Sequence, residues 1–455
     1  MNYFNNSFNK LDAIEWKLTP YQILSLGFAS LILFGSLLLT LPIASSNGQS
    51  LPFIDALFTA TSAVCVTGLT VVDTGTFFSL FGQLVIIFLI QCGGLGIMTM
   101  STLMAILMRK KLLLKDRLIM QEALNQLTFS GIIRLVIYIV KITFFIEFIG
   151  GTFLAVRFYL DFGLQGIYYG YWHAISAFCN AGFDIIGANN NNLLPYVGDI
   201  TVNLSITTLI ILGGLGFGVF TDINVNRNIK KLSLHTKLVL LTTAGLIFFG
   251  TLSIFLLEYS NPATIAHMPF KDQFFASYFQ AITARTAGFA TINLGAMTHA
   301  AAFVIIILMF IGASPGSTGG GIKTTTFAII LASIWSQVRG NEETTIFYRT
   351  IPQLLIQRAF TIFFVFLLLV TCFTLLIDIN EPAYTTSTVA FEVVSAFSTA
   401  GLTLGITPSL TSLSKFLLIL AMFLGRVGPV TFALALVMRS KKKKLRYPEG
   451  KVSIG

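Results

Sequence analysis

The chain has 455 residues, of which 55% are hydrophobic and 11% are charged, and its mean hydropathy is +0.82. This composition excludes an ordinary soluble domain, because a soluble core of this size buries far less apolar material. The formal net charge is +10, yet the Lys and Arg residues are scattered over separate connecting segments, which argues against a nucleic-acid-binding protein. The composition therefore predicts a membrane protein.

Eight apolar runs are long enough to span a bilayer, which takes about 20 helical residues. The residues ahead of the first run, 1–19, are mostly polar and lack an apolar core with a small-residue cleavage site, so they are interpreted as a cytoplasmic lead-in and not as a signal peptide. An all-α membrane protein with eight transmembrane helices is predicted. In chain order the runs cover 20–42, 79–108, 135–160, 199–221, 236–257, 301–338, 359–377 and 413–438.

A related glycine motif lies between the two spans of each consecutive pair. The glycines are 114, 106 and 113 residues apart, so the chain contains one unit four times. The predicted repeats are 1–115, 116–228, 229–342 and 343–455. The motifs are Ser-Ala-Val-Cys-Val-Thr-Gly-Leu (62–69), Ser-Ala-Phe-Cys-Asn-Ala-Gly-Phe (176–183), Thr-Ala-Arg-Thr-Ala-Gly-Phe (283–289) and Ser-Ala-Phe-Ser-Thr-Ala-Gly-Leu (395–402), with the glycines Gly68, Gly182, Gly288 and Gly401.

The first repeat shows what one unit contains. After an outer helix that ends near Pro42, residues 52–60 form a helical stretch too short to cross the membrane, so the chain enters and leaves on one side. Non-helical backbone at membrane depth must face protein or water, since each unpaired peptide group in hydrocarbon costs several kcal/mol. We therefore predict four pseudo-symmetric repeats of helix, re-entrant pore helix and helix around one central pore, with four pore loops.

The glycine motifs suit such a pore, because backbone carbonyls can replace the hydration shell of an ion. The partly negative C-terminal end of each short helix would favour a cation at the same place. The alternative is that the motifs are small-residue helix contacts, which are common in membrane bundles. Four motifs in equal positions favour the pore.

The basic residues predict the orientation. Of the 29 Lys and Arg residues, 22 lie in the two terminal segments and in the turns that join one repeat to the next, so both termini are expected in the cytoplasm. The segments between the two helices of each repeat are rich in Asp and Glu, against only Lys271 and Arg285, so the outer mouth should attract cations. The basic tail from Arg439 to Arg446 is interpreted as a stop-transfer anchor that can also contact anionic membrane lipid.

The four cysteines, Cys65, Cys92, Cys179 and Cys372, all fall in or beside membrane segments, and no spacing resembles a metal site. No disulfide and no zinc site are expected. Further strings in the chain are Gly-Gly-Leu-Gly at 93–96 and 213–216, a glycine-rich break at 312–321, Gly-Arg-Val-Gly-Pro at 425–429 and Arg-Tyr-Pro-Glu-Gly at 446–450.

Together with the four repeats, these strings resemble the Trk/Ktr/HKT superfamily of potassium transporters, and in particular the membrane subunits of bacterial Ktr uptake systems. The resemblance covers nearly the whole chain. It implies a multi-pass protein of the bacterial cell membrane, a homodimer of pores, and a cytoplasmic ring of nucleotide-binding regulatory subunits of the KtrA/KtrC type. The nucleotide is then expected on the partner, and no cofactor is expected to be bound covalently to this chain.

The resemblance also implies a selectivity filter. A serine at the first glycine is associated with sodium-selective members of the superfamily, and this chain has Gly68 there, so potassium is the implied ion, with sodium as a second one. The third motif departs from the others because Arg285 stands where the first two motifs have Cys. We expect Arg285 to turn behind the filter and pair with an acid. The implied filter residues are Val66, Thr67, Gly68, Asn180, Ala181, Gly182, Thr286, Ala287, Gly288, Thr399, Ala400 and Gly401.

Two gate elements are predicted. The run 301–338 is too long for one straight span and has a centre that cannot form a stable helix, so a loop inside the membrane is expected below the filter. Its likeness to a phosphate-binding loop fails, because Ile322 is inserted before Lys323 and no strand precedes the glycines. The loop residues are Gly312, Ala313, Ser314, Pro315, Gly316, Ser317, Thr318, Gly319, Gly320 and Gly321.

The second gate element is Arg426, near the centre of the last span. An arginine at mid-membrane costs at least about 2.5 kcal/mol, so it should face water or a partner. We favour an electrostatic barrier that also binds the loop carbonyls, over a structural clamp between repeats. By position, His173 and Glu392 are expected to brace the filter from behind, and Lys141 and Glu147 to make local or inter-repeat pairs.

Two other classes of protein fit the sequence less well. An alternating-access transporter binds its substrate at broken helices, but such folds usually repeat in large inverted halves and not in four parallel units. A membrane-embedded enzyme would need convergent acid, base and nucleophile, whereas the histidines are scattered over mouths and turns. A potassium-conducting uptake protein without enzyme activity is the preferred hypothesis. The histidines are His173, His235, His267 and His299.

Overall fold

The computed structural model describes residues 20–96, 99, 132–186 and 193–428. The predicted lead-in, the basic residues within 109–131, and the basic tail with the motif at 446–450 lie outside the described residues. Within them the chain is mostly helical, as predicted. The strands found there, β1 (Thr345–Ile346) and β2 (Arg349–Thr350), form one two-residue antiparallel hairpin.

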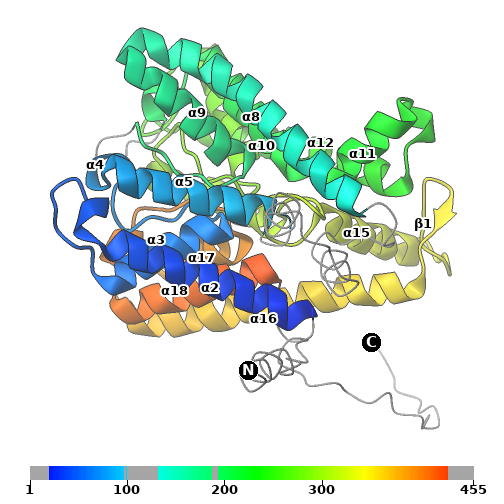
Figure 1. Cartoon of the computed structure of the whole chain (residues 1–455). Helices are drawn as coiled ribbons and strands as arrows, with labels where there is room; N and C mark the ends of the chain where they lie inside the picture. Colours follow the sequence, from blue (N-terminus) through cyan, green and yellow to red (C-terminus); the bar gives the residue numbers. More distant parts are fainter. Residues whose placement is uncertain (1–19, 97–98, 100–131, 187–192, 429–455) are drawn as a thin grey trace, which may run out of the picture.

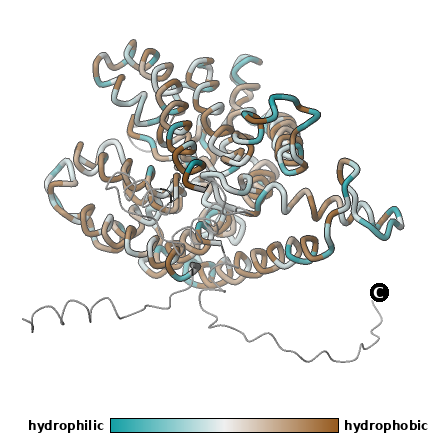
Figure 2. The backbone as a smooth tube through the Cα atoms, turned by 45° about the vertical axis from the view of Figure 1, so that its right-hand side comes forward, coloured by the Kyte–Doolittle hydropathy of each residue, from teal (hydrophilic) through white to brown (hydrophobic). Residues whose placement is uncertain are grey.

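Four long apolar helices agree with four of the predicted spans and are long and apolar enough to cross a bilayer. Their outward faces carry large apolar side chains; Phe148, Phe248 and Phe364, for example, are 63%, 62% and 60% exposed. Figure 2 shows hydrophobic residues along most of the helical length. Such a surface is expected where lipid is the solvent. The four helices are α2 (Pro20–Thr40), α8 (Ile132–Phe162), α12 (Leu234–Glu258) and α16 (Gln353–Asn380).

Four short helices follow the long ones, each ending a few residues before one of the four glycines. They have 13 to 15 residues, too few to cross a bilayer. Proline stands at the N-cap of two of them, Pro52 and Pro269, where its missing N–H has no helical partner to lose. The short helices are α3 (Phe53–Cys65), α9 (Leu164–Phe178), α13 (Phe270–Thr283) and α17 (Thr386–Ser398).

Four further helices complete the pattern, and each begins with a side-chain cap. Ser79, Asp199, Thr298 and Thr411 each accept a hydrogen bond from the backbone N–H three residues later, which satisfies a donor that the first helical turn leaves free. These inner helices are α5 (Leu80–Leu95), α10 (Ile200–Leu215), α14 (His299–Phe310) and α18 (Ser412–Val427).

The prediction of one long inner helix at 79–108 is wrong, and the helices in the runs 199–221 and 413–438 are also shorter than those runs. These helices stop at Gly96, Gly216 and Gly428, whose φ angles of 83°, 92° and 90° lie in the left-handed region that an α-helix cannot include. After Gly216 the chain turns by 88° into α11 (Phe217–Asn226). In the described part, four helices therefore qualify as spans by length and composition, or five if this bent pair is counted.

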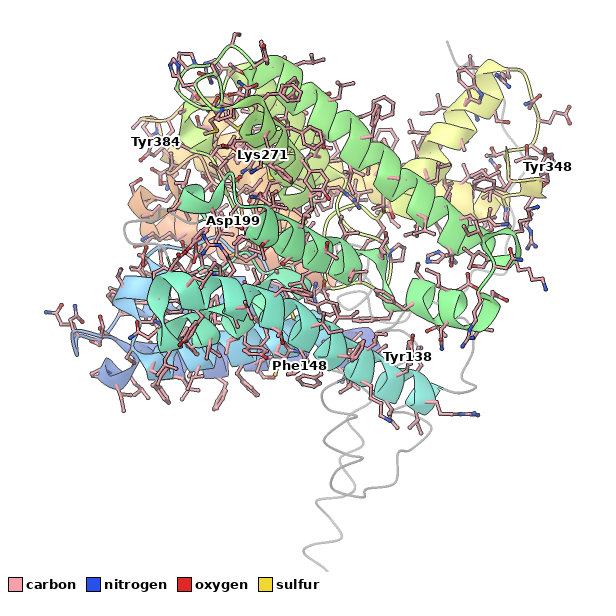
Figure 3. All side chains as sticks on the ribbon, turned by 90° about the horizontal axis from the view of Figure 1, so that it is seen from above. Tyr138, Phe148, Asp199, Lys271, Tyr348 and Tyr384 are labelled. Carbon is pink, nitrogen blue, oxygen red and sulfur yellow. The ribbon has the colours of Figure 1, made fainter. Side chains whose placement is uncertain are left out.

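The remaining short elements connect the helices. α15 (Thr324–Val338) follows the loop after α14 and leads into the β1–β2 hairpin, which projects at the end of the molecule opposite α4 (Thr74–Phe77) in Figure 1. Asp199, Lys271 and Tyr384 lie toward one end of the helix bundle in Figure 3, and Tyr348, in the hairpin, lies toward the other. The 3₁₀ turns are Pro42–Ala44, Leu194–Tyr196, Ile229–Lys231, Leu294–Ala296 and Thr407–Ser409.

The first and last repeats pack against each other, with α3 beside α18 (Figure 1). Lys415 Nζ of α18 lies 2.8 Å from Asp55 Oδ1 of α3, and the two side chains are only 12% and 18% exposed. This partly buried ion pair therefore joins the first repeat to the last repeat.

Removing one charge of this pair should destabilise the protein. We expect Asp55→Asn to lower the free energy of unfolding by about 1 to 2 kcal/mol, between the values for exposed and buried pairs. Thermal unfolding of purified protein in detergent measures this. Lys271→Gln is the matched control, because Lys271 is 54% exposed and 4.0 Å from its acid. A charge swap at residues 55 and 415 that restores no stability would contradict the assignment.

Candidate functional site

The four glycines come together in the centre of the molecule. A Cβ built on Gly68, Gly182, Gly288 or Gly401 would lie 3.0 Å or less from a backbone oxygen of the next motif. In each case that oxygen belongs to the residue before the next glycine, which closes the four motifs into a ring. The four oxygens are, in the same order, Ala181 O, Ala287 O, Ala400 O and Thr67 O.

The backbone of each motif has an unusual conformation. The glycines have φ between 68° and 99°, where a side chain is strained. Two residues earlier, the non-glycine residues Val66, Asn180, Thr286 and Thr399 have φ between 49° and 73°. A left-handed conformation costs a non-glycine residue roughly 1–2 kcal/mol. The same two positive-φ positions occur in all four motifs, which indicates that this backbone conformation has a function.

Local hydrogen bonds hold the motifs in this conformation. Ser62 Oγ accepts from Gly68 N at 3.0 Å, and the hydroxyls of Ser176 and Thr283 donate to Phe183 O and Phe289 O at 2.9 and 2.7 Å. These bracing roles were not predicted, although a hydroxyl residue at the start of every motif was the available signal. The hydroxyls of Thr67, Ser395, Ser398 and Thr399 are buried and have no hydrogen-bond partner among the residues that the structure describes.

A cavity of about 350 Å³ opens on one side of the ring. All four glycines line it, together with Asp73 and Asp184, so acidic side chains stand at its wall. An acidic wall with a carbonyl floor favours a cation. The further lining residues include Thr70, Thr74, Asn293 and Thr403.

The two predicted bracing residues each bind the chain just beyond a glycine. His173 Nε2 lies 2.7 Å from Asp184 Oδ1, and its Nδ1 lies 2.7 Å from Tyr169 O. Both ring nitrogens of His173 therefore face oxygen atoms, and these two contacts hold the orientation of the imidazole ring. Glu392 accepts from Leu404 N at 3.1 Å and from Thr407 Oγ1 at 2.9 Å.

The glycine-rich segment lies on the other side of the ring, as a non-helical loop between α14 and α15. A Cβ on Gly319 or Gly320 would collide with the hydroxyl of Thr286 or Thr399, so the loop touches two of the motifs. Its backbone is also held by the second repeat: Ser314 N donates to Gly214 O at 3.0 Å.

Two cationic side chains bind carbonyl oxygens of this loop. Arg426 donates to Thr318 O of the loop and to Gly93 O of α5. Lys323 Nζ donates to Gly319 O at 2.8 Å. Sequence reasoning used Lys323 only to dismiss a phosphate-binding loop and missed this contact; a cation directly after a glycine-rich break was the signal.

Arg285 differs from its prediction. It is 7% exposed, but its Nε has no hydrogen-bond partner, and no acid pairs with it among the described residues. The expected ion pair is therefore wrong for that part of the chain. Lys141 likewise makes no ion pair there, whereas Glu147 binds Gln91 of the first repeat, as expected of an inter-repeat contact.

Long apolar helices around a ring of strained glycine segments, with a cavity on one side and a bound loop on the other, define a membrane transport protein. The chain belongs to the TrkH family of cation transport proteins, whose family model matches residues 17–446. This membership confirms the predicted superfamily and the prediction of a transporter and not an enzyme.

Two relatives match nearly end to end. The chain is 46% identical to the Ktr system potassium uptake protein B of Bacillus subtilis over 444 residues, which are 97% of this chain and 98% of the relative. It is 41% identical to the potassium/sodium uptake protein NtpJ of Enterococcus hirae, covering 97% and 98%. The fold is similar to that of the potassium transporter TrkH from Vibrio parahaemolyticus, with a TM-score of 0.70, 18% identity and coverage of 90% and 84%.

Proposed function

We propose that this chain is the ion-translocating subunit of a potassium uptake system in the bacterial cell membrane. The observation that carries the proposal is the ring of four glycine motifs, in which each glycine touches the carbonyl that precedes the next. Relatives that match nearly the whole chain are named potassium uptake proteins, which supports potassium as the ion.

In this proposal the twelve residues of the four motifs form the selectivity filter, with three residues from each repeat. A potassium ion that reaches the acidic cavity loses water and gains backbone carbonyl oxygens in return. In each motif the positive-φ glycine and the strained residue two positions earlier turn the carbonyls toward the ion. Because glycine has no side chain, nothing at that position blocks the ion's path. The membrane potential drives the ion inward with roughly 2.3 kcal/mol per charge per 100 mV.

The loop 312–321 and Arg426 form the proposed gate. The loop lies against Thr286 and Thr399 on the side away from the acidic cavity, and Arg426 ties it to α5. With both termini and the basic turns in the cytoplasm, this gate faces the cell interior. A cytoplasmic ring of KtrA/KtrC-like subunits, which carries the nucleotide, would then control a homodimer of these chains, and the name of the Enterococcus relative supports sodium as a second ion.

Ion flux through purified protein in liposomes tests this function. With a potassium gradient and a clamped membrane potential, we expect rubidium or potassium uptake that follows the potential and exceeds sodium uptake. Empty liposomes, and liposomes that contain the Gly401→Ala variant, are the controls. Uptake that requires a fixed ratio of a second ion, and that stops without it, would replace the pore by a coupled transporter.

A further inference from the structure

A basic segment joins the second repeat to the third, and the proposed pathway does not use it. This α11 segment, residues 217–231, contains α11 and the 3₁₀ turn Ile229–Lys231. α11 is turned by 88° from α10, so it does not continue the crossing that α10 makes. In Figure 1 it lies toward the same end of the molecule as the β1–β2 hairpin.

The α11 segment lies close to the membrane surface, because the span of α12 follows it directly. The apolar run 236–257 begins five residues after Lys231. Headgroup layers extend roughly 5–8 Å beyond each side of the hydrocarbon core, and a lysine side chain covers much of such a distance with its flexible stem. The basic side chains of the segment are therefore within reach of lipid headgroups.

Three of these basic side chains have no acidic partner. Arg227, Lys230 and Lys231 are exposed, and none of them forms an ion pair with a residue that the structure describes. All three lie within five consecutive residues. Such a concentration of unpaired positive charge attracts anions.

The one acid within 217–237 is turned inward. Asp222 Oδ2 accepts from Ser233 N at 2.9 Å, from Ser233 Oγ at 2.8 Å and from Thr236 Oγ1 at 2.5 Å. Its Oδ1 accepts from Asn226 Nδ2 at 2.5 Å. The carboxylate is thus occupied by hydroxyl, amide and backbone donors, and it forms no ion pair with the three basic side chains.

Exposed apolar side chains alternate with the basic ones. Val225 and Ile229 are 72% and 80% exposed, and Arg227 lies midway between them in the sequence. Segments that combine exposed aliphatic side chains with Lys and Arg bind at the interface of a bilayer that contains anionic lipid. Protein interfaces are instead enriched in aromatic residues and depleted in Lys. Residues 221–237 contain three lysines and no aromatic residue, which favours lipid over a protein partner.

The α11 segment is also held in place by the rest of the chain. At its start, Phe217 N donates to Gly316 O of the loop at 2.9 Å. At its end, Lys237 Nζ of α12 donates to Lys230 O at 2.9 Å. A surface that is already ordered loses less entropy when it binds a ligand than a flexible one does.

We propose that the α11 segment is a binding surface for the headgroups of anionic phospholipids, in the leaflet from which α12 starts. Arg227, Lys230 and Lys231 contact the lipid phosphate. Val225 and Ile229 enter the boundary between headgroups and acyl chains. The proposed orientation places this surface on the cytoplasmic side, and the binding does not depend on which ion the chain carries.

A fluorophore beside the surface tests the proposal in the full-length protein. Asn224 is exposed and lies next to Val225, so Asn224→Cys can carry an environment-sensitive label. Among the native cysteines, Cys372 is exposed and is replaced by Ser, whereas the other three are buried. Phosphatidylglycerol or phosphatidylcholine is then added to the labelled protein in detergent. We expect the blue shift of the label to need at least about fivefold less phosphatidylglycerol than phosphatidylcholine.

Charge variants then locate the site. In the labelled protein, the double substitution Lys230→Gln and Lys231→Gln should raise the required phosphatidylglycerol concentration at least about fivefold, since one basic residue near an anionic surface contributes about that factor. Glutamine leaves the turn intact, because Lys230 takes part in its hydrogen bonds only through backbone atoms. The matched control is Arg339→Gln with Arg349→Gln, two exposed basic residues near Glu342 and Glu343, and it should follow the wild type.

Three results would overturn the proposal. The first is an equal response to the two lipids, or an unchanged response in the double lysine variant. The second is reversal of the blue shift by inorganic phosphate, which would assign the surface to a free anion. The third is an unchanged lipid response together with lost binding of a KtrA/KtrC-like subunit in the double lysine variant, which would assign the surface to a protein. None of these results bears on ion flux, so the proposed function is tested separately.

Discussion

In the Gly68→Ser variant, the preference for potassium over sodium is expected to be about tenfold lower than in the wild type. This change is equivalent to about 1.4 kcal/mol of differential ion binding. Gly68 has φ of 99°, and a Cβ there would lie 2.6 Å from Ala181 O. Serine can fit only if this oxygen moves. In the proposed filter that oxygen is one of the ion's ligands, so the variant changes ion choice more than it changes the fold.

The expected loss of potassium preference follows from the arrangement of the ring. Each glycine supports the carbonyl of the neighbouring motif, so a displacement at Gly68 passes to Ala181 and toward Gly182. A carbonyl that turns away leaves fewer protein oxygens around the ion, and the preference for potassium depends on the number and field strength of those oxygens. We therefore expect a lower potassium rate with a smaller change in the sodium rate.

Competition uptake of potassium and sodium in liposomes measures the ratio. Gly48→Ala is the matched control, because Gly48 also has a positive φ, 71°, but has no atom within 4 Å of a built Cβ. This variant carries the same backbone strain away from the ring and should keep the wild-type ratio. An unchanged ratio in Gly68→Ser, with normal insertion and dimer content, would remove Gly68 from the filter.

Much of this architecture could be predicted from the sequence because it is written in patterns of length and repetition. The spans at 20–42, 135–160 and 236–257 were predicted within a few residues of α2, α8 and α12, because apolar length alone determines a membrane helix. The even spacing of the four glycines placed them together, and the structure brings them into one ring.

The points at which the inner helices end could not be predicted from the apolar pattern of the sequence. The apolar run 79–108 continues past Gly96, and nothing in its hydropathy shows that Gly96 takes a left-handed conformation. Hydropathy also does not show the close packing of Gly93, three residues earlier, which lies so near Val64 O that no side chain fits. Gly213 and Gly425 make the same contact with Phe178 O and Phe397 O.

The contacts of individual side chains were harder to predict than the helices. The acid expected beside Arg285 is not present among the described residues. The sequence can indicate that a cation is buried in a turn, but it does not indicate which residue lies opposite that cation. The contact of Arg426 with α5 is a clearer case. Arg426 stands where the strings 93–96 and 213–216 have their second glycine, and its side chain binds Gly93 O of the first of these strings.

Replacing Arg426 by alanine should raise potassium flux severalfold when no regulatory partner is present. The guanidinium donates to Thr318 O in the loop and to Gly93 O in α5, so it links the loop to the wall of the pathway. Without it, the loop is held on this side by its own contacts alone. A positive charge is also removed from the cation's route, which lowers the electrostatic barrier.

Lysine at the same position separates these two effects. Arg426→Lys keeps the charge, but an ammonium cannot reproduce the planar fork that reaches two carbonyls from different segments. If the charge is the barrier, this variant stays near the wild-type flux; if the bridge to the loop matters more, its flux rises nearly as far as in Arg426→Ala. Lys323→Met is the control for loop contacts, because Lys323 binds only carbonyls of the loop itself and leaves the link to α5 in place.

Single-channel or liposome flux measurements decide between a gate and a structural clamp. A gate predicts that Arg426→Ala conducts more than the wild type while its melting temperature and dimer content stay similar. A clamp predicts the opposite, because loss of a partly buried group that satisfies two carbonyls leaves both without this donor, and an unsatisfied buried carbonyl costs about 1–3 kcal/mol. Lower flux together with lower stability would therefore assign Arg426 to holding the repeats together, and the loop 312–321 would have to close the pathway without it.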